Sequence, residues 1–151
     1  MTRFFVDPEE LEGEQISLAG ENAAHAKVLR LKAGEEVLVC DGQGRECLCA
    51  VSDVSPGQIS LVVLEHRQAQ GEPAVCAKIY MGLPKADKME WIIQKTVELG
   101  VEGIYPVSMS RCIVKLDDSK KKSKTARWQA IAESAAKQSK RSVIPEVHDA
   151  I

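Results

Sequence analysis

The sequence predicts an α+β chain with two domains: a small β-barrel over residues 1–70 and the first half of an α/β domain over residues 74–151. Three observations predict this division. Short apolar segments separated by turn-forming clusters fill the first part, as is typical of a barrel. A polar stretch at 65–73 ends in glycine and proline, which indicates a domain boundary. Beyond it, apolar strands alternate with helical patterns, which predicts parallel strands joined by crossover helices.

The barrel part is defined by its turns. Asp41-Gly42-Gln43-Gly44 is a turn-forming cluster between two apolar segments and therefore predicts a hairpin. Ser55-Pro56-Gly57 predicts a second turn that leads into another strand. We expect strands at 37–40, 47–51 and 58–64, with one helix near 21–30.

The first helix of the α/β part can be argued from its ends. Asp87 is a good N-cap, and Glu90 three residues later can complete a capping box. Apolar residues from Met89 to Val97 recur at helical spacing and predict a core-facing stripe. Gly100 then predicts a left-handed stop. The expected elements of this part are strands at 74–83 and 104–107, helices at 87–99 and 123–139, and a further strand near 147.

The alternation ends at 147–151, beside the start of that further strand. An open parallel sheet needs both of its faces covered and more strands than this sequence provides. We therefore expect the α/β domain to be truncated.

Composition excludes several classes of protein. Hydrophobic residues make up 44% of the 151 residues, which supports a core, and no apolar run reaches membrane-spanning length. The N-terminus becomes acidic within a few residues, which excludes a secretory signal. Five cysteines without a CxxC pair argue against a disulfide framework and a zinc site, and they fit a reducing cytoplasm. We expect neither a membrane nor a metal as a partner.

The net charge of −2 hides a strong asymmetry. The segment 111–141 carries a local charge of +7, and the remaining residues together carry −9. An acidic body with one basic segment is a footprint of nucleic-acid binding, although a solvated helix face gives the same charge pattern.

An aromatic residue lies between two cations on the first α/β helix. Lys88, Trp91 and Lys95 are spaced to share one helical stripe, where an indole could stack on a base while the ammonium groups meet phosphates. The alternative is that Trp91 packs against a partner while the lysines are solvated.

Further cations follow the ends of the predicted strands. Ligands of open α/β sheets bind beyond the carboxyl ends of the strands, so we expect Lys85, Lys88, Arg111 and Lys115 to converge there. The lysine run at 120–124 is expected to be a solvated loop.

Several motifs resemble a known family. In the barrel part they are Arg3-Phe4-Phe5-Val6, His25-x-x-x-Leu29-Arg30 and Asp41-Gly42-x-Gly44. In the α/β part they are Lys85-x-Asp87-Lys88-Met89-Glu90, Gln94-Lys95, Glu98-Leu99-Gly100-Val101, Pro106, Arg111, Val114-Lys115, Arg127-Trp128, Ile131-Ala132, Gln138, Arg141 and Pro145-Glu146-Val147. Together they are similar to the RsmE family of ribosomal RNA methyltransferases, and they cover the chain in order.

The resemblance implies a PUA-like RNA-binding barrel followed by a SPOUT methyltransferase domain. It implies a cytoplasmic homodimer that uses S-adenosylmethionine to methylate N3 of one uridine in the 16S ribosomal RNA of the small subunit. The glycine-rich segments that build the family's donor-binding knot are absent from this sequence. We therefore expect a truncated, inactive form whose donor site belongs to the missing C-terminal part, so no catalytic or cofactor-binding residue is assigned.

The residues that remain are assigned to RNA binding. They are Arg3, His25 and Arg30 in the barrel and Lys85, Lys88, Lys95, Arg111, Lys115 and Arg141 in the α/β part. Cations near the target base would stabilise the negative charge that spreads onto O2 and O4 when N3 loses its proton. Two alternatives stay open: a non-catalytic RNA-binding adaptor, and an α/β enzyme that acts on a small anionic metabolite.

Overall fold

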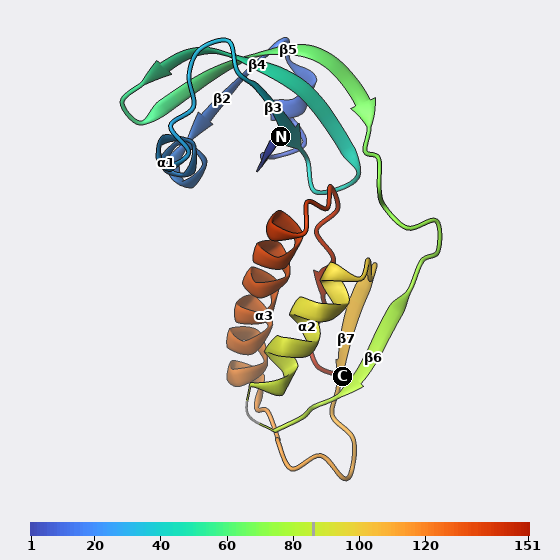
Figure 1. The fold of residues 1–151 in the computed structure, drawn as a ribbon. Helices are drawn as coiled ribbons and strands as arrows, with labels where there is room; N and C mark the ends of the chain where they lie inside the picture. Colours follow the sequence, from blue (N-terminus) through green and yellow to red (C-terminus); the bar gives the residue numbers. More distant parts are fainter. Residues whose placement is uncertain (86) are drawn as a thin grey trace. The chain divides into compact units, whose positions relative to one another are not determined.

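A computed structural model describes residues 1–85 and 87–151 (Figure 1). The chain divides into two compact units, Met1–Gln70 and Gly71–Ile151. Each unit has its own cluster of buried apolar side chains.

The first unit is a five-stranded sheet with strand order β1-β3-β4-β5-β2. Its elements are β1 (Thr2–Phe5), the short 3-10 helix η1 (Glu10–Glu12), β2 (Gln15–Ala19), α1 (Gly20–Val28), β3 (Glu36–Cys40), β4 (Arg45–Ser55) and β5 (Gln58–Gln68). Only the β1–β3 pair is parallel. The long β4–β5 ribbon curves over the other strands in Figure 1, and its register shifts at Leu48/Cys49 and Val51/Asp53. Such bulges increase the local twist and bend of a strand, which curves the sheet around its core.

The predicted hairpin at the turn 41–44 is confirmed, because β3 and β4 pair in antiparallel fashion on either side of it. The strand predicted at 58–64 is longer than expected. It continues to Gln68, four residues into the polar stretch, because the start of β4 supplies backbone partners as far as Arg45 opposite Gln68. Local composition does not show this pairing, because both strands carry polar side chains here.

Three buried cysteines belong to the barrel core: Cys40, Cys47 and Cys49. Cys47 and Cys49 are alternate residues of β4, so both thiols lie on the same, inward face of the strand. Burial raises the pKa of Cys49 to about 12 and raises the pKa of Cys47 as well. All five cysteines are free thiols, and Cys76 is exposed.

The second unit is a three-stranded parallel sheet covered on one face by two helices (Figure 1). Its elements are β6 (Lys78–Gly82), α2 (Lys88–Glu98), β7 (Gly103–Val107), α3 (Asp118–Gln138) and β8 (Glu146–Val147). The helix stripe predicted in α2 is confirmed, with Met89, Ile93 and Val97 all buried. Trp128 of α3 is 4% exposed and packs in the same core.

Two predicted details of the helix ends are wrong. The basic run at 120–124 is helical rather than a loop, because α3 begins at Asp118 and the side chain of Asp117 accepts the backbone N–H of Lys120 at 2.8 Å. The capping box at α2 does not form. Asp87 is the N-cap without a side-chain bond to the helix, and the Glu90 carboxylate instead pairs with Arg127 of α3 at 2.8 Å.

The helix end at Gly100 agrees with the prediction. Gly100 has a φ of +94°, and the N–H groups of Gly100 and Val101 donate to the carbonyls of Val97 and Thr96. This pair of hydrogen bonds is the Schellman motif, which places a glycine in the left-handed conformation after the helix.

The other face of the parallel sheet carries a row of stacked rings. Tyr80 and Tyr105 are register partners on β6 and β7, and their ring centroids are 4.6 Å apart. The ring of His148 stacks on Tyr105 at 4.0 Å. These side chains alternate with Ile79, Ile104 and Val147, which face the helices.

Candidate nucleic-acid interface

Three predicted RNA contacts lie in the barrel unit, and Arg3 is the least exposed. The Arg3 Nη2 atom donates to Oε2 of Glu46 at 3.1 Å, and 11% of the Arg3 side chain is exposed. Arg67 donates to Oε1 of the same carboxylate at 3.0 Å. The nearly buried Glu46 is therefore held between two guanidinium groups, a partnership that the sequence analysis did not foresee.

His25 and Arg30 lie at the exposed end of α1. The ring of His25 packs edge-on against Phe4, with centroids 5.7 Å apart. Arg30 follows the helix with a φ of +55°, in a position where helices usually carry glycine.

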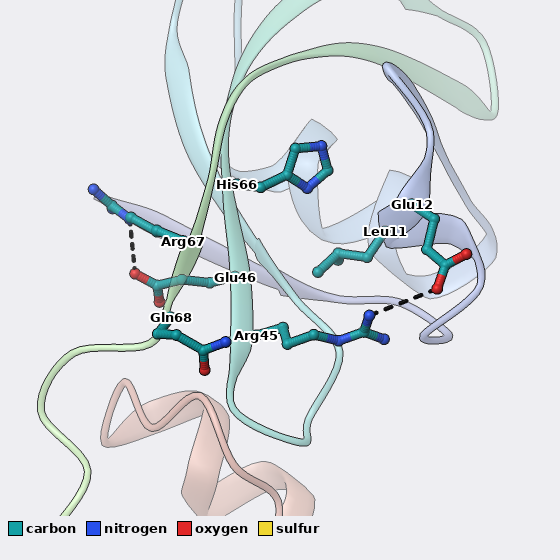
Figure 2. Close-up of a pocket in the computed structure, with 7 residues that line it drawn as sticks. All are labelled: Leu11, Glu12, Arg45, Glu46, His66, Arg67 and Gln68. Carbon is teal, nitrogen blue, oxygen red and sulfur yellow. Dashed lines mark hydrogen bonds and ion pairs between the residues drawn. The ribbon is translucent and has the colours of Figure 1, made fainter.

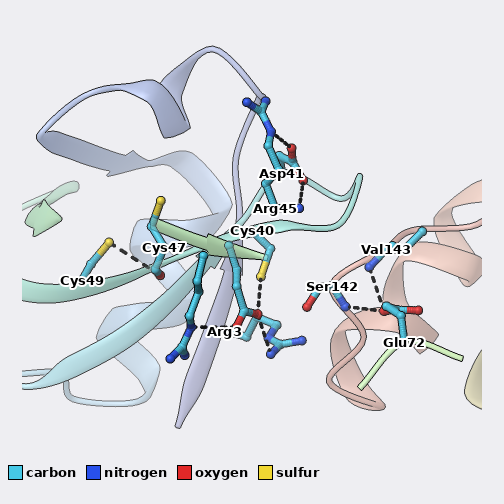
Figure 3. Close-up of polar contacts among 11 residues, drawn as sticks. Arg3, Cys40, Asp41, Arg45, Cys47, Cys49, Glu72, Ser142 and Val143 are labelled. Atoms are coloured by element: carbon cyan, nitrogen blue, oxygen red, sulfur yellow. Dashed lines mark hydrogen bonds and ion pairs between the residues drawn. The ribbon is translucent and has the colours of Figure 1, made fainter. Parts of the chain in front are cut away.

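The hairpin turn of the barrel orders an arginine that the sequence analysis did not single out. Figure 3 shows Asp41 accepting Nε of Arg45, and the distance is 2.7 Å. The same carboxylate accepts the backbone N–H groups of Gln43 and Arg45. Burial alone would raise the pKa of Asp41, but these hydrogen bonds outweigh it and lower the pKa. The position of Arg45 directly after the turn-forming cluster was the feature of the sequence that could have indicated this ordered arginine.

In the α/β unit, two loops meet beyond the carboxyl ends of β6 and β7. A Cβ atom added to Gly82 would lie 3.2 Å from the Met109 sulfur, so the end of β6 lies against the loop that follows β7. Lys115 folds back on this loop and donates to the carbonyl of Met109 at 3.2 Å. Lys85, Lys88 and Arg111 are exposed in the same two loops and at the start of α2.

A small cavity of about 170 Å³ lies between these loops and α3. Its lining combines apolar side chains with the polar residues Asp87 and Lys124. The edge of the sheet therefore has both a concave surface and nearby cations, as expected from the rule that open α/β sheets bind ligands at this edge.

The stripe Lys88, Trp91 and Lys95 is present on α2, although its members differ in what they contact. The side chain of Trp91 is 63% exposed, which leaves the indole face open to a partner. Lys95 pairs with Glu98 at 2.8 Å, so its charge is partly balanced within the helix.

Arg141 lies apart from this edge. Its side chain is 9% exposed and binds the Glu72 carboxylate at 2.7 Å. It also donates to the carbonyls of Val97 and Val101 at 3.3 and 2.7 Å. These contacts bind the guanidinium within the α/β unit and stabilise its fold. We therefore leave Arg141 out of the proposed interface.

Neither a metal centre nor a membrane-spanning helix is found among residues 1–85 and 87–151. Within these residues, no cluster of three or more His, Cys, Asp or Glu side chains has an arrangement that could hold a metal ion. The helices there are also too short or too polar to cross a membrane.

Both parts of the chain match known families of RNA methyltransferase domains. A family described as an RNA methyltransferase domain matches residues 72–151, and an RNA methyltransferase PUA domain matches residues 18–64. The ribosomal RNA small subunit methyltransferase E (RsmE) of Bacillus subtilis is 39% identical over 153 aligned positions. The chain belongs to the RsmE family of RNA methyltransferases. The predicted resemblance and the predicted fold class, a PUA-like barrel followed by a SPOUT-type α/β domain, are confirmed.

Other members of the RsmE family also match this chain over nearly its whole length. RsmE of Mycobacterium tuberculosis is 30% identical to this chain, of which the match covers 95%. A crystal structure of RsmE from Neisseria gonorrhoeae, bound to S-adenosylmethionine, superposes with a TM-score of 0.84 at 30% identity and covers the whole chain. The chain spans 60% of the Bacillus protein, 55% of the Mycobacterium protein and 62% of the Neisseria structure.

Proposed function

We propose that this chain is the RNA-binding and scaffold part of an enzyme that methylates N3 of a uridine in the 16S ribosomal RNA of the small subunit. The match of residues 72–151 to the RNA methyltransferase domain is the observation that carries the proposal. The exposed cations at the carboxyl edge of the parallel sheet support it, because RNA binding depends on neutralising phosphates. Because its proposed substrate is ribosomal RNA, we propose that the protein acts in the cytoplasm.

The cations also suit the chemistry of the reaction. Uridine N3 lies on the Watson–Crick edge, so the target base must be unpaired or flipped out of a helix. N3 is a weak acid, and its anion spreads charge onto O2 and O4. Lys88 and Arg111, exposed at the sheet edge, are suited to stabilise that charge and the flanking phosphates.

The methyl donor that we propose is S-adenosylmethionine, to which the Neisseria relative is bound. When bound, this cofactor supplies an electrophilic sulfonium methyl group. The cavity of about 170 Å³ at the sheet edge is smaller than the roughly 300 Å³ at which ligand pockets usually begin. The described residues lining it do not fit the whole donor, and we place the donor site in the part of the parent protein that this chain does not span. We propose a homodimer for that parent protein.

Binding of a ribosomal RNA fragment tests the RNA part of the proposal. We expect Lys88→Ala and Arg111→Ala each to weaken binding about five- to tenfold, and to reduce the dependence of affinity on salt by about one ion. Lys78→Ala is the matched control, because Lys78 is an exposed lysine at the opposite end of β6. Equal losses in all three variants would contradict a specific interface at the carboxyl edge.

A second candidate function, a non-catalytic RNA-binding adaptor, is favoured by the small cavity. Calorimetric titration of S-adenosylmethionine into the 151-residue chain addresses the donor site. Stoichiometric binding would show that a donor site exists within these residues, contrary to our placement. Absence of binding, together with methylation activity in the parent protein, would support the methyltransferase over the adaptor.

A further inference from the structure

A second cavity lies in the barrel unit, at the end of the β4–β5 ribbon (Figure 2). Its volume is about 290 Å³. The lining comes from three elements that are distant in sequence: η1, the first residues of β4 and the last residues of β5. None of the residues assigned to RNA binding from the sequence lines it.

The register of the two strands explains which side chains face the cavity. Arg45 lies opposite Gln68, and Cys47 lies opposite His66. Because side chains alternate along a strand, these four residues share one face of the ribbon. Glu46 and Arg67 are on the other face, where they bind each other at 3.0 Å.

The floor and wall of the cavity are held in place by the fold. Leu11 of η1 is 3% exposed, and its carbonyl lies 3.8 Å from the Cys47 thiol. The Cys47 sulfur is also 3.1 Å from Nδ1 of His66, which positions the imidazole at the rim. Figure 2 shows Leu11 extending from η1 toward the β4–β5 ribbon.

The polar groups around this apolar floor offer both donors and acceptors. Arg45 is 44% exposed, and its Nη1 lies 3.6 Å from Oε1 of Glu12. Figure 2 shows the Gln68 amide directed toward Arg45. Within the described chain the Gln68 side chain makes no hydrogen bond of its own, so its amide is available to a ligand.

The net charge of the cavity indicates whether it would bind a phosphate or a nucleobase of an RNA. The charged side chains that face the cavity are Arg45 and Glu12, which balance one another. A phosphate site needs an excess of positive charge, whereas a nucleobase needs a flat apolar contact with donors and acceptors at its edge. The cavity has the second set of properties.

We propose that this cavity binds one unpaired base of an RNA, with the ring against Leu11 and His66 and its polar edge on Arg45 and Gln68. The inference rests on the proposed function, because it takes RNA as the ligand. It adds a base-reading site in the barrel to the phosphate-binding cations of the α/β unit. Unstacked bases held on aromatic rings or guanidinium planes are the usual basis of sequence-specific RNA recognition.

Titrations of the 151-residue chain, followed by the amide resonances of a ¹⁵N-labelled sample, test the site. We expect the four nucleoside monophosphates to shift the amides of Leu11, Arg45, His66 and Gln68, and ribose 5-phosphate to leave them unchanged. Equal shifts with ribose 5-phosphate would overturn the proposal in favour of an anion site. A hairpin RNA with one bulged base should reproduce the shifts, and a fully paired hairpin should not. Binding of free nucleotides without binding of the bulged hairpin would also overturn it.

Two variants make the assignment specific. Gln68→Ala and His66→Ala should weaken nucleotide binding about tenfold, which is the scale of one base-stacking or base-edge contact. Gln15→Ala is the control, because Gln15 is an exposed residue of β2 outside the cavity. Gln68→Ala disturbs no described side-chain contact, so unchanged binding in this variant would overturn the proposal even if His66→Ala failed to fold. The proposed function is tested by a separate result. If it is wrong, Lys88→Ala and Arg111→Ala will not weaken RNA binding, whereas the nucleotide-induced shifts of the barrel amides will be unaffected.

Discussion

Glu72 and Arg141 are 69 residues apart in sequence and form an ion pair within the α/β unit. Oε2 of Glu72 accepts two nitrogens of the Arg141 guanidinium at 2.7 and 3.1 Å. Oε1 accepts the backbone N–H groups of Ser142 and Val143 at 2.8 and 3.1 Å. The segment that precedes β6 is thereby fixed to the loop after α3.

Removing this carboxylate should destabilise the α/β unit. Loss of the pair leaves a nearly buried guanidinium uncompensated, so we expect Glu72→Gln to lower the free energy of unfolding by about 2–3 kcal/mol at neutral pH. Glu102→Gln is the control, because its pair with Lys78 is at the surface with a separation of 3.9 Å. Urea unfolding followed by tryptophan fluorescence measures both variants. Equal stability of Glu72→Gln and the wild type would contradict the assignment.

The same pair predicts a dependence on pH. Burial alone would raise the pKa of Glu72, but the bonds from Arg141 and from two amides outweigh it and lower the pKa below its ordinary value of 4.5. A lowered pKa in the folded state means that the stabilisation is complete above pH 4.5 and is lost as the pH falls through the folded-state value. The gap in stability between wild type and Glu72→Gln should therefore narrow in acid. If the difference in stability between the two proteins stayed constant below pH 4.5, the pKa of Glu72 would not differ between the folded and unfolded states.

A side chain at Gly100 should be more destabilising than one at Gly71. A Cβ atom at Gly100 would clash with Cγ of Pro73, and the φ of +94° is unfavourable for alanine. Gly71 has a similar φ of +100° but nothing within 4 Å of its Cβ position. We expect Gly71→Ala to cost about 1 kcal/mol from backbone conformation, and Gly100→Ala to cost clearly more. Thermal unfolding of the two variants separates steric from conformational strain, and similar midpoints would refute the close contact.

The two tryptophans should behave in opposite ways. Trp128 is 4% exposed, so Trp128→Ala should cost about 3–5 kcal/mol through lost burial and a cavity. Trp91 is 63% exposed, so Trp91→Ala should change stability by less than about 0.5 kcal/mol. If Trp91 stacks on a base, its removal should nevertheless weaken RNA binding. A large loss of stability on replacing Trp91 would instead assign it to the fold.

Arg30 allows strain and charge to be separated. Glycine would relieve the left-handed conformation at φ +55°, so Arg30→Gly should stabilise the barrel by about 1 kcal/mol. Arg30→Ala retains the strain and removes only the charge. We expect both variants to lose RNA affinity equally while differing in stability. Full RNA binding by Arg30→Gly would remove Arg30 from the interface.

Features that depend on neighbouring residues could be predicted from the sequence. The hairpin at 41–44, the buried stripe of α2 and the glycine stop at Gly100 each depend on a few adjacent residues, and each was predicted correctly. The early start of α3 was missed because a run of lysines has little apolar periodicity. Its N-cap Asp117 was the available signal.

The candidate site was less predictable, because ion pairs between distant residues decide which cations remain exposed. Arg3 and Arg141 look like their exposed counterparts in sequence, yet Glu46 and Glu72 occupy their guanidinium groups. The barrel cavity depends on the register of β4 and β5, and in particular on Arg45 lying opposite Gln68. No short motif encodes that register.

The buried thiols of the barrel give this protein an internal chemical reporter. Only the thiolate reacts quickly with an alkylating agent, and a pKa of about 12 leaves almost none of Cys49 in that form at neutral pH. Exposed Cys76 should be modified at once, whereas Cys40, Cys47 and Cys49 should be modified only when the barrel opens. Mass spectrometry of a timed alkylation would therefore follow the opening of one unit in the unmodified sequence, with no added probe.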